Sequence, residues 1–435
     1  MATRVGRARW STRLAAGVAA AVALALTGCS GSAAEQSGKE FTYWSMWKSG
    51  EPQQKVLADA IADFEQQHNV KIKVQWQGRT NLQKLVPALN TNDVPDLVDG
   101  PYLKMYPALA ATKQALGLGE AYATQVDGKP AGELIPAKLL QNINIKYPDG
   151  QPWMLPYQIQ SDAVWFNAAK HPELKTNPPK TWGEFIALLD RLKAAGETPI
   201  AADGDVAGYN AAYFGTMVLR ESGPGALMKL ASDKSGAAWD DPAVLDAAKK
   251  VEQLVKGGYF IKGYQASKFP AQQQKWANNG AALMFMGSWM PTESASYAAA
   301  GFEFGSFPFP TTGSQDSQRA DVLGFAVPKK AKNAKLAQEF AAFFLGKKYQ
   351  DASGAEAKML PIRSDATTAP ELADVKATLD NASAYHQQLD GVAFPGYNEK
   401  VLSPNDDELF LGKISAEQFV SKMKAAQIAY WKTQN

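Results

Sequence analysis

Several tryptophans and acids follow the predicted strands of this chain at the points where those strands end. Trp44 and Trp47 follow the first strand, and Asp99 follows the third. Gly287-Ser288-Trp289 and residues 321–325 occupy the same kind of position later in the chain. Aromatic rings stack on the apolar C–H faces of sugars, whose hydroxyls need fixed donors and acceptors. The pattern favours a carbohydrate site, although any one tryptophan is more often part of a core.

Hydrophobic periodicity predicts the elements that must position these residues. Apolar residues indicate strands over 41–44 and 70–76, and a one-sided apolar face predicts a helix over 52–68. Thr181-Trp-Gly-Glu184 and Ser415-Ala-Glu-Gln418 are capping boxes that open two further helices. Strand–helix–strand order favours an α/β fold with mostly parallel sheets, in which ligands bind beyond the carboxyl ends of the strands.

The first 28 residues have the composition of a secretory signal. Four arginines precede an apolar run over 14–26, which is shorter than the roughly 20 residues of a membrane-spanning helix. Leu26-Thr-Gly-Cys29 resembles a bacterial lipobox, in which the cysteine is acylated before cleavage. Because two or more acyl chains anchor a protein stably, we expect a lipoprotein on the outer leaflet of a bacterial membrane. The alternative is an ordinary signal with an incidental cysteine.

Charge and composition give several other functions no support. Without the four arginines of the signal, 41 basic and 43 acidic side chains remain, so charge does not favour nucleic-acid binding. A single cysteine allows no internal disulfide. His68, His171 and His386 lack the spacing of a metal site, and no glycine-rich nucleotide loop is present. We expect no metal, no cofactor and no nucleic-acid partner.

Eight groups of residues occur in the order found in a known family. Examples are Val94-Pro-Asp-Leu-Val98, Trp153-Met-Leu-Pro-Tyr157, Gly324-Phe-Ala-Val-Pro-Lys329 and, closest of all, Asn279-Gly-Ala-Ala-Leu-Met-Phe-Met-Gly-Ser-Trp289. In these segments the chain resembles the extracellular solute-binding proteins of carbohydrate ABC importers. The resemblance implies two α/β lobes, joined by hinge crossovers, that close around a sugar. It also implies an ABC permease as partner and a monomeric receptor.

The resemblance implies lobes that are discontinuous in sequence. After the signal (1–28) and a flexible tether (29–39), lobe 1 would comprise 40–157 and 308–345, and lobe 2 would comprise 158–307 and 346–435. The chain would cross near 157–161, return near 308–321 and cross again near 345–346.

The resemblance also implies which residues line the sugar site. Lobe 2 would contribute Gly287, Ser288 and Trp289, and lobe 1 would contribute Trp44, Trp47, Asp99, Gly324 and Phe325. The crossover would contribute Tyr157, Gln160 and Asp162. Arg363 would donate a fork of hydrogen bonds to hydroxyls. The polar and aromatic stretch at a predicted helix start adds Tyr209, Asn210 and Tyr213, for which a packing role is equally open.

The number of stacking candidates favours an oligosaccharide over a monosaccharide, and two other functions stay open. A secreted glycoside hydrolase needs two carboxylates about 5–10 Å apart, and candidates exist at Asp99, Asp162, Asp203, Asp205 and Asp321. All of these acids could instead act as caps or acceptors, and no Gly-x-Ser-x-Gly elbow is present. A non-sugar solute such as a peptide is the other alternative. We expect binding without catalysis.

Overall fold

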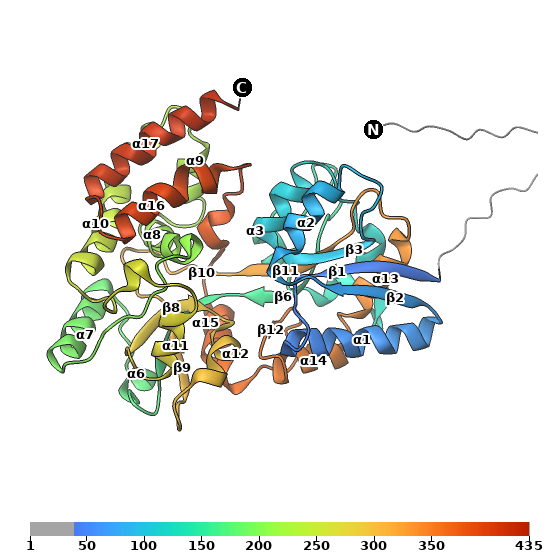
Figure 1. Ribbon diagram of the computed structural model, residues 1–435, viewed down its shortest axis with the longest axis horizontal. Coiled ribbons are helices and arrows are strands. Elements are labelled where there is room, and N and C mark those ends of the chain that lie inside the picture. The colour runs from blue at the N-terminus through green and yellow to red at the C-terminus, as the bar shows by residue number, and fades with distance from the viewer. Residues whose placement is uncertain (1–38, 435) are drawn as a thin grey trace, which may run out of the picture. The chain divides into compact units, whose positions relative to one another are not determined.

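The computed structural model describes residues 39–434, which contain two main β-sheets flanked by helices (Figure 1). The larger sheet has six strands in the order β12-β6-β11-β3-β1-β2. Its parallel part comprises β1 (Glu40–Ser45), β2 (Lys71–Trp76) and β3 (Leu97–Pro101). Its antiparallel part comprises β6 (Leu155–Gln160), β11 (Asp321–Ala326) and β12 (Leu360–Pro361). The predicted signal, Cys29 and the tether up to residue 38 lie outside the described residues.

The smaller sheet consists of β8 (Leu283–Gly287), β7 (Asp162–Asn167) and β9 (Phe304–Phe307), in that order. Both of its strand pairs are antiparallel. The α/β class is therefore confirmed, but the prediction of mostly parallel sheets is wrong for this sheet and for one side of the larger one. Each antiparallel pair of the two main sheets includes β6, β7 or β11, the strands at which the chain passes from one sheet to the other. Neighbouring strands become parallel only when a crossover returns the chain to the same end of the sheet.

The long helices form where the sequence supplies caps and one apolar face. α1 (Pro52–His68) begins with a proline, which needs no N–H in the first turn, and ends before Asn69 in a left-handed conformation. The helix predicted over 52–68 is thus confirmed. α7 (Trp182–Ala194) and α17 (Ala416–Lys432) both begin with their predicted capping boxes.

Within the described residues, the chain passes between the two sheets three times. β6 leads into β7 with only Ser161 between them, and β9 leads back through β10 (Gln318–Arg319) to β11. α13 (Ala334–Phe343) and α14 (Lys347–Ala355) then contact α1, and β12 pairs with β6. The predicted start of lobe 2 at residue 346 is therefore wrong for 347–361. The chain rejoins the smaller sheet with α15 (Ala373–Asn381), which contacts β9.

Helices surround each sheet separately in Figure 1. α8 (Ala207–Ser222), α10 (Pro242–Lys256) and α16 (Ser403–Phe410) contact one another on the side of the smaller sheet, where α7 and α17 also lie. The other short helices are α2 (Asn81–Ala88), α3 (Tyr102–Met105), α4 (Gly119–Ala123), α5 (Ala137–Asn142), α6 (Glu173–Thr176), α9 (Ala226–Ser232), α11 (Ala271–Ala277) and α12 (Met290–Ser294). The remaining strands are β4 (Gln125–Val126), β5 (Lys129–Pro130) and β13 (Tyr385–His386).

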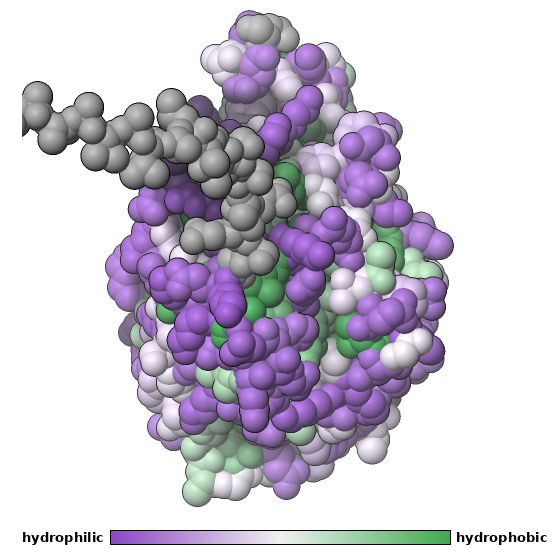
Figure 2. All heavy atoms as spheres, turned by 90° about the vertical axis from the view of Figure 1, so that its right-hand side faces the viewer, coloured by the Kyte–Doolittle hydropathy of each residue, from purple (hydrophilic) through white to green (hydrophobic). Residues whose placement is uncertain are grey.

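Apolar side chains fill the interior of both lobes rather than forming one large surface patch. Trp153, Trp165, Trp239 and Trp276 are fully buried and Trp47 is nearly so, which places five of the eleven tryptophans in the core. On the face shown in Figure 2, hydrophilic side chains dominate and apolar ones form small groups. Within 39–434, no helix has both the length and the apolar composition that crossing a membrane requires.

Candidate functional site

A small hollow lies where β8 ends, beside the start of β7. Its volume is only about 10 Å³ as measured with a water-sized sphere, which is about the room that one water molecule needs. Four predicted site residues come together there, namely Asp162, Tyr209, Gly287 and Trp289. The rest of its lining comprises Ala212, Phe285, Met286, Arg319 and Gln388. The hollow therefore combines aromatic, charged and amide side chains next to the strand that connects the two sheets.

The backbone after β8 fixes the position of Trp289. A Cβ atom on Gly287 would lie 2.1 Å from the Trp289 ring, so only glycine lets the indole lie against the end of the strand. Ser288 is tied to the first crossing, because its N–H donates to the Ser161 carbonyl at 2.8 Å and its hydroxyl accepts from the Ser161 N–H at 3.3 Å. The ring is consequently held at the point where the chain changes sheets.

The Trp289 ring has one aromatic and one cationic neighbour. The Tyr209 ring, from α8, lies 6.3 Å away between ring centres and is inclined by 28°. The guanidinium carbon of Arg319 lies 5.6 Å from the Trp289 ring centre, within the range of a cation–π interaction. The indole N–H is buried near the Tyr209 hydroxyl, without a hydrogen bond of ordinary geometry among the described residues. It is a donor that a ligand hydroxyl in the hollow could satisfy.

Arg319 is a functional-site candidate that the sequence reasoning missed. It is buried and donates from Nε to Asp321 at 2.6 Å, from Nη1 to Asp162 at 2.5 Å and from Nη2 to Gln388 at 3.0 Å. Burial opposes the charge of the guanidinium, but the two carboxylates outweigh burial and raise the pKa of Arg319. For Asp162, burial outweighs the cation and raises its pKa. Three of the four residues at 318–321 are polar or charged, as in an exposed loop, and only the fold reveals that all four are buried.

Three predicted residues of the first lobe form a closed hydrogen-bond network. Trp47 donates from its indole to the Tyr157 hydroxyl at 3.1 Å, and Tyr157 donates to Asp99 at 2.8 Å. The other Asp99 oxygen accepts from the Met46 N–H at 2.7 Å. Burial raises the pKa of Asp99 to about 6, and these hydrogen bonds limit the rise. The network is buried and fixes the ends of β1, β3 and β6 relative to one another.

The other predicted residues of the first lobe divide between edge and core. Trp44 and Gln160 are half-buried near the ends of β1 and β6. Phe325 is fully buried, and its ring lies 4.7 Å from that of Tyr157. Gly324 pairs with Gly100, and a Cβ atom there would come within 2.6 Å of Met154. Gly324 and Phe325 therefore pack the sheet and do not line the hollow.

Two of the three residues predicted near the start of α8 have packing roles. Tyr213 is buried, with its ring 5.1 Å from Phe410 and 5.2 Å from Phe285. Asn210 is also buried and donates to the Gly204 carbonyl and to Asp407. Only Tyr209 lines the hollow, because a helix turns neighbouring residues toward different faces.

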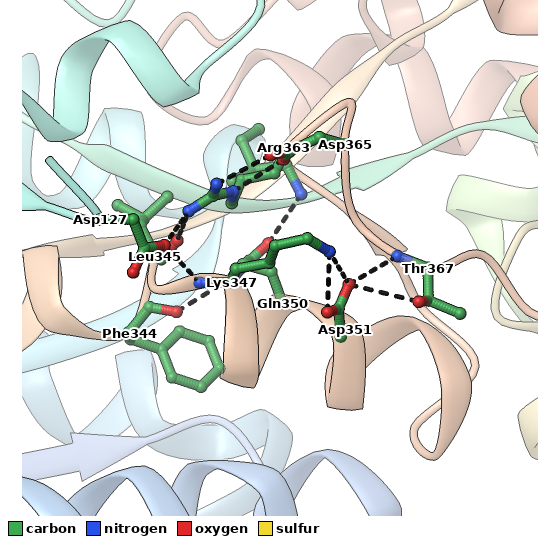
Figure 3. Close-up of polar contacts among 10 residues, drawn as sticks. Asp127, Phe344, Leu345, Lys347, Gln350, Asp351, Arg363, Asp365 and Thr367 are labelled. Carbon is green, nitrogen blue, oxygen red and sulfur yellow. Dashed lines mark hydrogen bonds and ion pairs between the residues drawn. The ribbon is translucent and has the colours of Figure 1, made fainter. Parts of the chain in front are cut away.

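Arg363 lies in a separate clasp (Figure 3). Its guanidinium donates to both Asp365 oxygens at 2.8 and 2.9 Å, to Asp127, and to the Leu345 carbonyl. A second hollow near this clasp has Asp127 in its lining together with Phe64 and Phe343, and none of the predicted site residues lines it. The structure thus gives Arg363 the task of holding 345–365 together, not that of lining the Trp289 hollow.

The acids considered for a hydrolase all have hydrogen-bond partners. Asp203 accepts from the N–H groups of Gln272 and Gln273, and Asp205 accepts from that of Phe269. Asp99, Asp162 and Asp321 are engaged as described above. Among residues 39–434, no group of three or more histidine, cysteine or acidic side chains could hold a metal ion.

Comparisons with known proteins agree with this arrangement. A diacetylchitobiose binding protein, NgcE, of Streptomyces coelicolor is 26% identical over 45% of this chain and 43% of its own length, so the chain spans less than half of that relative. A multiple sugar-binding protein of Streptococcus mutans is 23% identical over 80% of this chain and 83% of its own length. A solved chitin oligosaccharide binding protein has the same fold, with a TM-score of 0.72, 22% identity and coverage of 89% and 98% of the two chains.

The family itself is shown by a longer match. The sequence profile of the bacterial extracellular solute-binding proteins matches residues 48–351, well over half of the 435-residue chain. The chain belongs to the bacterial extracellular solute-binding proteins.

Proposed function

We propose that this protein is the substrate-binding lipoprotein of an ABC sugar importer, which captures an oligosaccharide between its two lobes and delivers it to the permease. The observation that carries the proposal is the hollow at the end of β8. Trp289 and Tyr209 supply aromatic surface there, and Asp162, Arg319 and Gln388 supply acceptors and donors. Apolar rings with a few fixed polar groups are what a sugar ring requires.

The relatives support the sugar class of the cargo. One is described as binding diacetylchitobiose, another as binding multiple sugars, and the fold matches that of a chitin oligosaccharide binding protein. The presence of more than one aromatic ring at the site favours an oligosaccharide over a monosaccharide. A glycoside hydrolase is the less favoured function, because each candidate acid already accepts hydrogen bonds from the protein.

The mechanism is capture and release without bond cleavage. Near the hinge, the Ala357 carbonyl accepts from Gln53 of α1 at 3.4 Å and from Thr292 of α12 at 3.3 Å, so both lobes bind the same loop. A ligand that contacts both lobes favours the closed arrangement by its difference in affinity for the closed and open states. The closed form is what the permease would recognise.

The receptor would act outside the cytoplasm as a monomer. A lipid on Cys29 would anchor it to the outer leaflet, and residues 30–39 would link the anchor to β1. The family membership supports the extracytoplasmic location.

A thermal-shift screen of residues 30–435 against mono- and oligosaccharides, followed by calorimetry, tests the proposal. A ligand at 100 times its dissociation constant adds about 2.7 kcal/mol to the free energy of unfolding, so the melting temperature rises. The expected result is a rise with an oligosaccharide that is recovered intact. A cleaved sugar would instead indicate a hydrolase, and a rise only with peptides would replace the proposed cargo.

A further inference from the structure

The second hollow, near the Arg363 clasp, is large enough for a small molecule. Its volume is about 580 Å³ as measured with a water-sized sphere, and small-molecule sites commonly have about 300–1,000 Å³. Its walls come from four parts of the first lobe: the end of α1, β4 with the residues around it, the last turns of α13 and the start of α14. The hollow at Trp289 shares no lining residue with it. The two hollows are therefore separate sites.

One wall of the second hollow is aromatic. The His68 ring is stacked on that of Phe64, with the ring centres 4.1 Å apart and the planes inclined by 22°. The Phe343 ring lies 5.3 Å from Phe64 and 5.0 Å from Tyr349. Phe64 and Tyr349 are buried, whereas Phe343 is half-buried and His68 is exposed. Such a wall gives the apolar part of a ligand a surface to pack against, and aromatic rings also attract cations.

The side-chain charges around the second hollow leave one acid without a cation. Lys347 and Lys348 both line the hollow, but Lys347 is paired with Asp351 and Lys348 with Asp63. Glu339, on α13, also lines it and is half-buried. Within the part of the chain that the structure describes, its carboxylate has neither a hydrogen-bond donor nor an ion-pair partner.

The ends of the surrounding helices favour a positive charge as well. α1 ends at His68 and α13 ends at Phe343, so two helix C-termini border the second hollow. The C-terminal end of a helix carries a partial negative charge, which attracts cations. α14 has its N-terminus there, but an acid already occupies that end, because Asp127 accepts from the Lys347 N–H at 2.8 Å (Figure 3). A cation is thus better matched to the second hollow than an anion.

We propose that the second hollow binds a small organic cation with an apolar body, of the alkylammonium or arylammonium class. The apolar body packs against the rings of Phe343 and its aromatic neighbours, and the ammonium group pairs with Glu339. A charge taken out of water is costly unless it is paired. The free carboxylate therefore makes the second hollow select a cation over a neutral molecule or an anion of the same shape.

Benzylamine, benzyl alcohol and benzoate test this selectivity, because they share one shape and differ in charge. Each is titrated into residues 30–435 at pH 7, and the backbone amide signals are followed by NMR. Benzylamine, as a cation, binds with a dissociation constant of about 1 mM or lower and shifts the amides of 124–127 and 346–349. Benzoate binds at least about tenfold more weakly. Equal binding of the three compounds, or shifts confined to other residues, overturns the proposal.

Substitutions that change only the charge of the second hollow provide the second test. Gln125 is exposed and lines the hollow, so its replacement leaves the core intact. Gln125→Lys weakens benzylamine binding about fivefold, and Gln125→Glu strengthens it by a similar factor. Glu339→Gln costs about tenfold, because it removes the carboxylate that pairs with the ammonium group.

Glu356→Gln is the matched control, since Glu356 is an exposed acid at the other end of α14 and does not line the second hollow. It leaves benzylamine binding unchanged, and equal melting temperatures show that all the variants fold. An affinity that neither Gln125→Lys nor Glu339→Gln changes overturns the assignment of a cation. Benzylamine is titrated without any sugar, so failure of the sugar screen leaves this site standing.

Discussion

Arg319 donates to the Asp162 carboxylate at 2.5 Å, and these two residues belong to different passages of the chain between its sheets. Asp162 opens β7 just after the first passage, and Arg319 stands two residues before β11 on the return. The same guanidinium lies 5.6 Å from the Trp289 ring. The ion pair therefore connects the proposed sugar platform to the strands about which the lobes would move.

Arg319→Gln should destabilise the protein strongly. It leaves Asp162 and Asp321 buried without their cation, and loss of one partner from a buried ion pair costs about 3–5 kcal/mol. Urea unfolding at pH 7 measures this cost. Lys256→Gln is the control, because it removes a surface pair in which Lys256 is 72% exposed and should change the stability little. Similar effects of the two variants would show that Arg319 has no special structural role.

Asp99 should make the stability depend on pH in a defined direction. Its pKa rises from 3.8 to about 6 on folding, because burial disfavours the carboxylate. The folded state therefore holds this proton more tightly, and the stabilisation is fully present below about pH 4 and lost as the pH rises through 6. The change amounts to about 3 kcal/mol.

Unfolding of the wild type and Asp99→Asn by urea between pH 4 and 7 isolates this effect. The difference between the two curves should vary across that range, since the amide does not titrate. Subtracting the variant also removes the contribution of His386, whose pKa burial lowers to about 3 and which acts in the opposite direction. Parallel curves would contradict the assignment.

Asp406, in α16, should have a similar pH effect at a different place in the fold. It is buried, and neither of its carboxylate oxygens has a partner among the described residues. Burial and the neighbouring Asp407 raise its pKa well above the ordinary value, so its contribution to stability falls as the pH rises above about 4. Asp406→Asn should therefore be more stable than the wild type at pH 8, with a difference that shrinks toward pH 4. A difference independent of pH, measured by urea unfolding, would refute this.

Local patterns in the sequence predicted the elements well. The helix over 52–68 and the capping boxes at Thr181 and Ser415 depend on residues within a few positions of one another. Strand direction was predicted less well, because it depends on which sheet the chain joins next. The lobe to which α14 belongs was also predicted wrongly. Its local sequence does not indicate which lobe its apolar face will cover, and the structure packs it against α1.

Residues that line the hollow were predictable only where a residue's place in the chain also fixes its surroundings. Gly287 and Trp289 follow a strand end and line the hollow. Tyr213 and Phe325 have the same aromatic character but point into the core, a difference that depends on packing. Arg319 was missed because its burial depends on Asp162, which lies 157 residues away in the sequence, as well as on the neighbouring Asp321.

Trp289→Ala should remove most of the sugar affinity and leave the fold intact. The ring is only half-buried, and a central aromatic contact is commonly worth about 2 kcal/mol or more, which corresponds to about 30-fold in the dissociation constant. Calorimetry with the oligosaccharide found in the screen measures the loss. Trp431→Ala is the matched control, because that half-buried indole packs in α17 and donates to the Ala231 carbonyl. Equal affinities of the two variants would place the site elsewhere.

Gly287→Ala should weaken sugar binding without any direct contact between the new methyl group and the ligand. The added Cβ would lie 2.1 Å from the Trp289 ring, so the indole must leave its position. Because both changes act on one ring, the double variant with Trp289→Ala should lose little more affinity than Trp289→Ala alone. Gly183→Ala, in α7, is the control: nothing lies within 4 Å of its Cβ position, and alanine favours a helix. Additive losses in the double variant would mean that Gly287 contributes through its backbone and not through the position of Trp289.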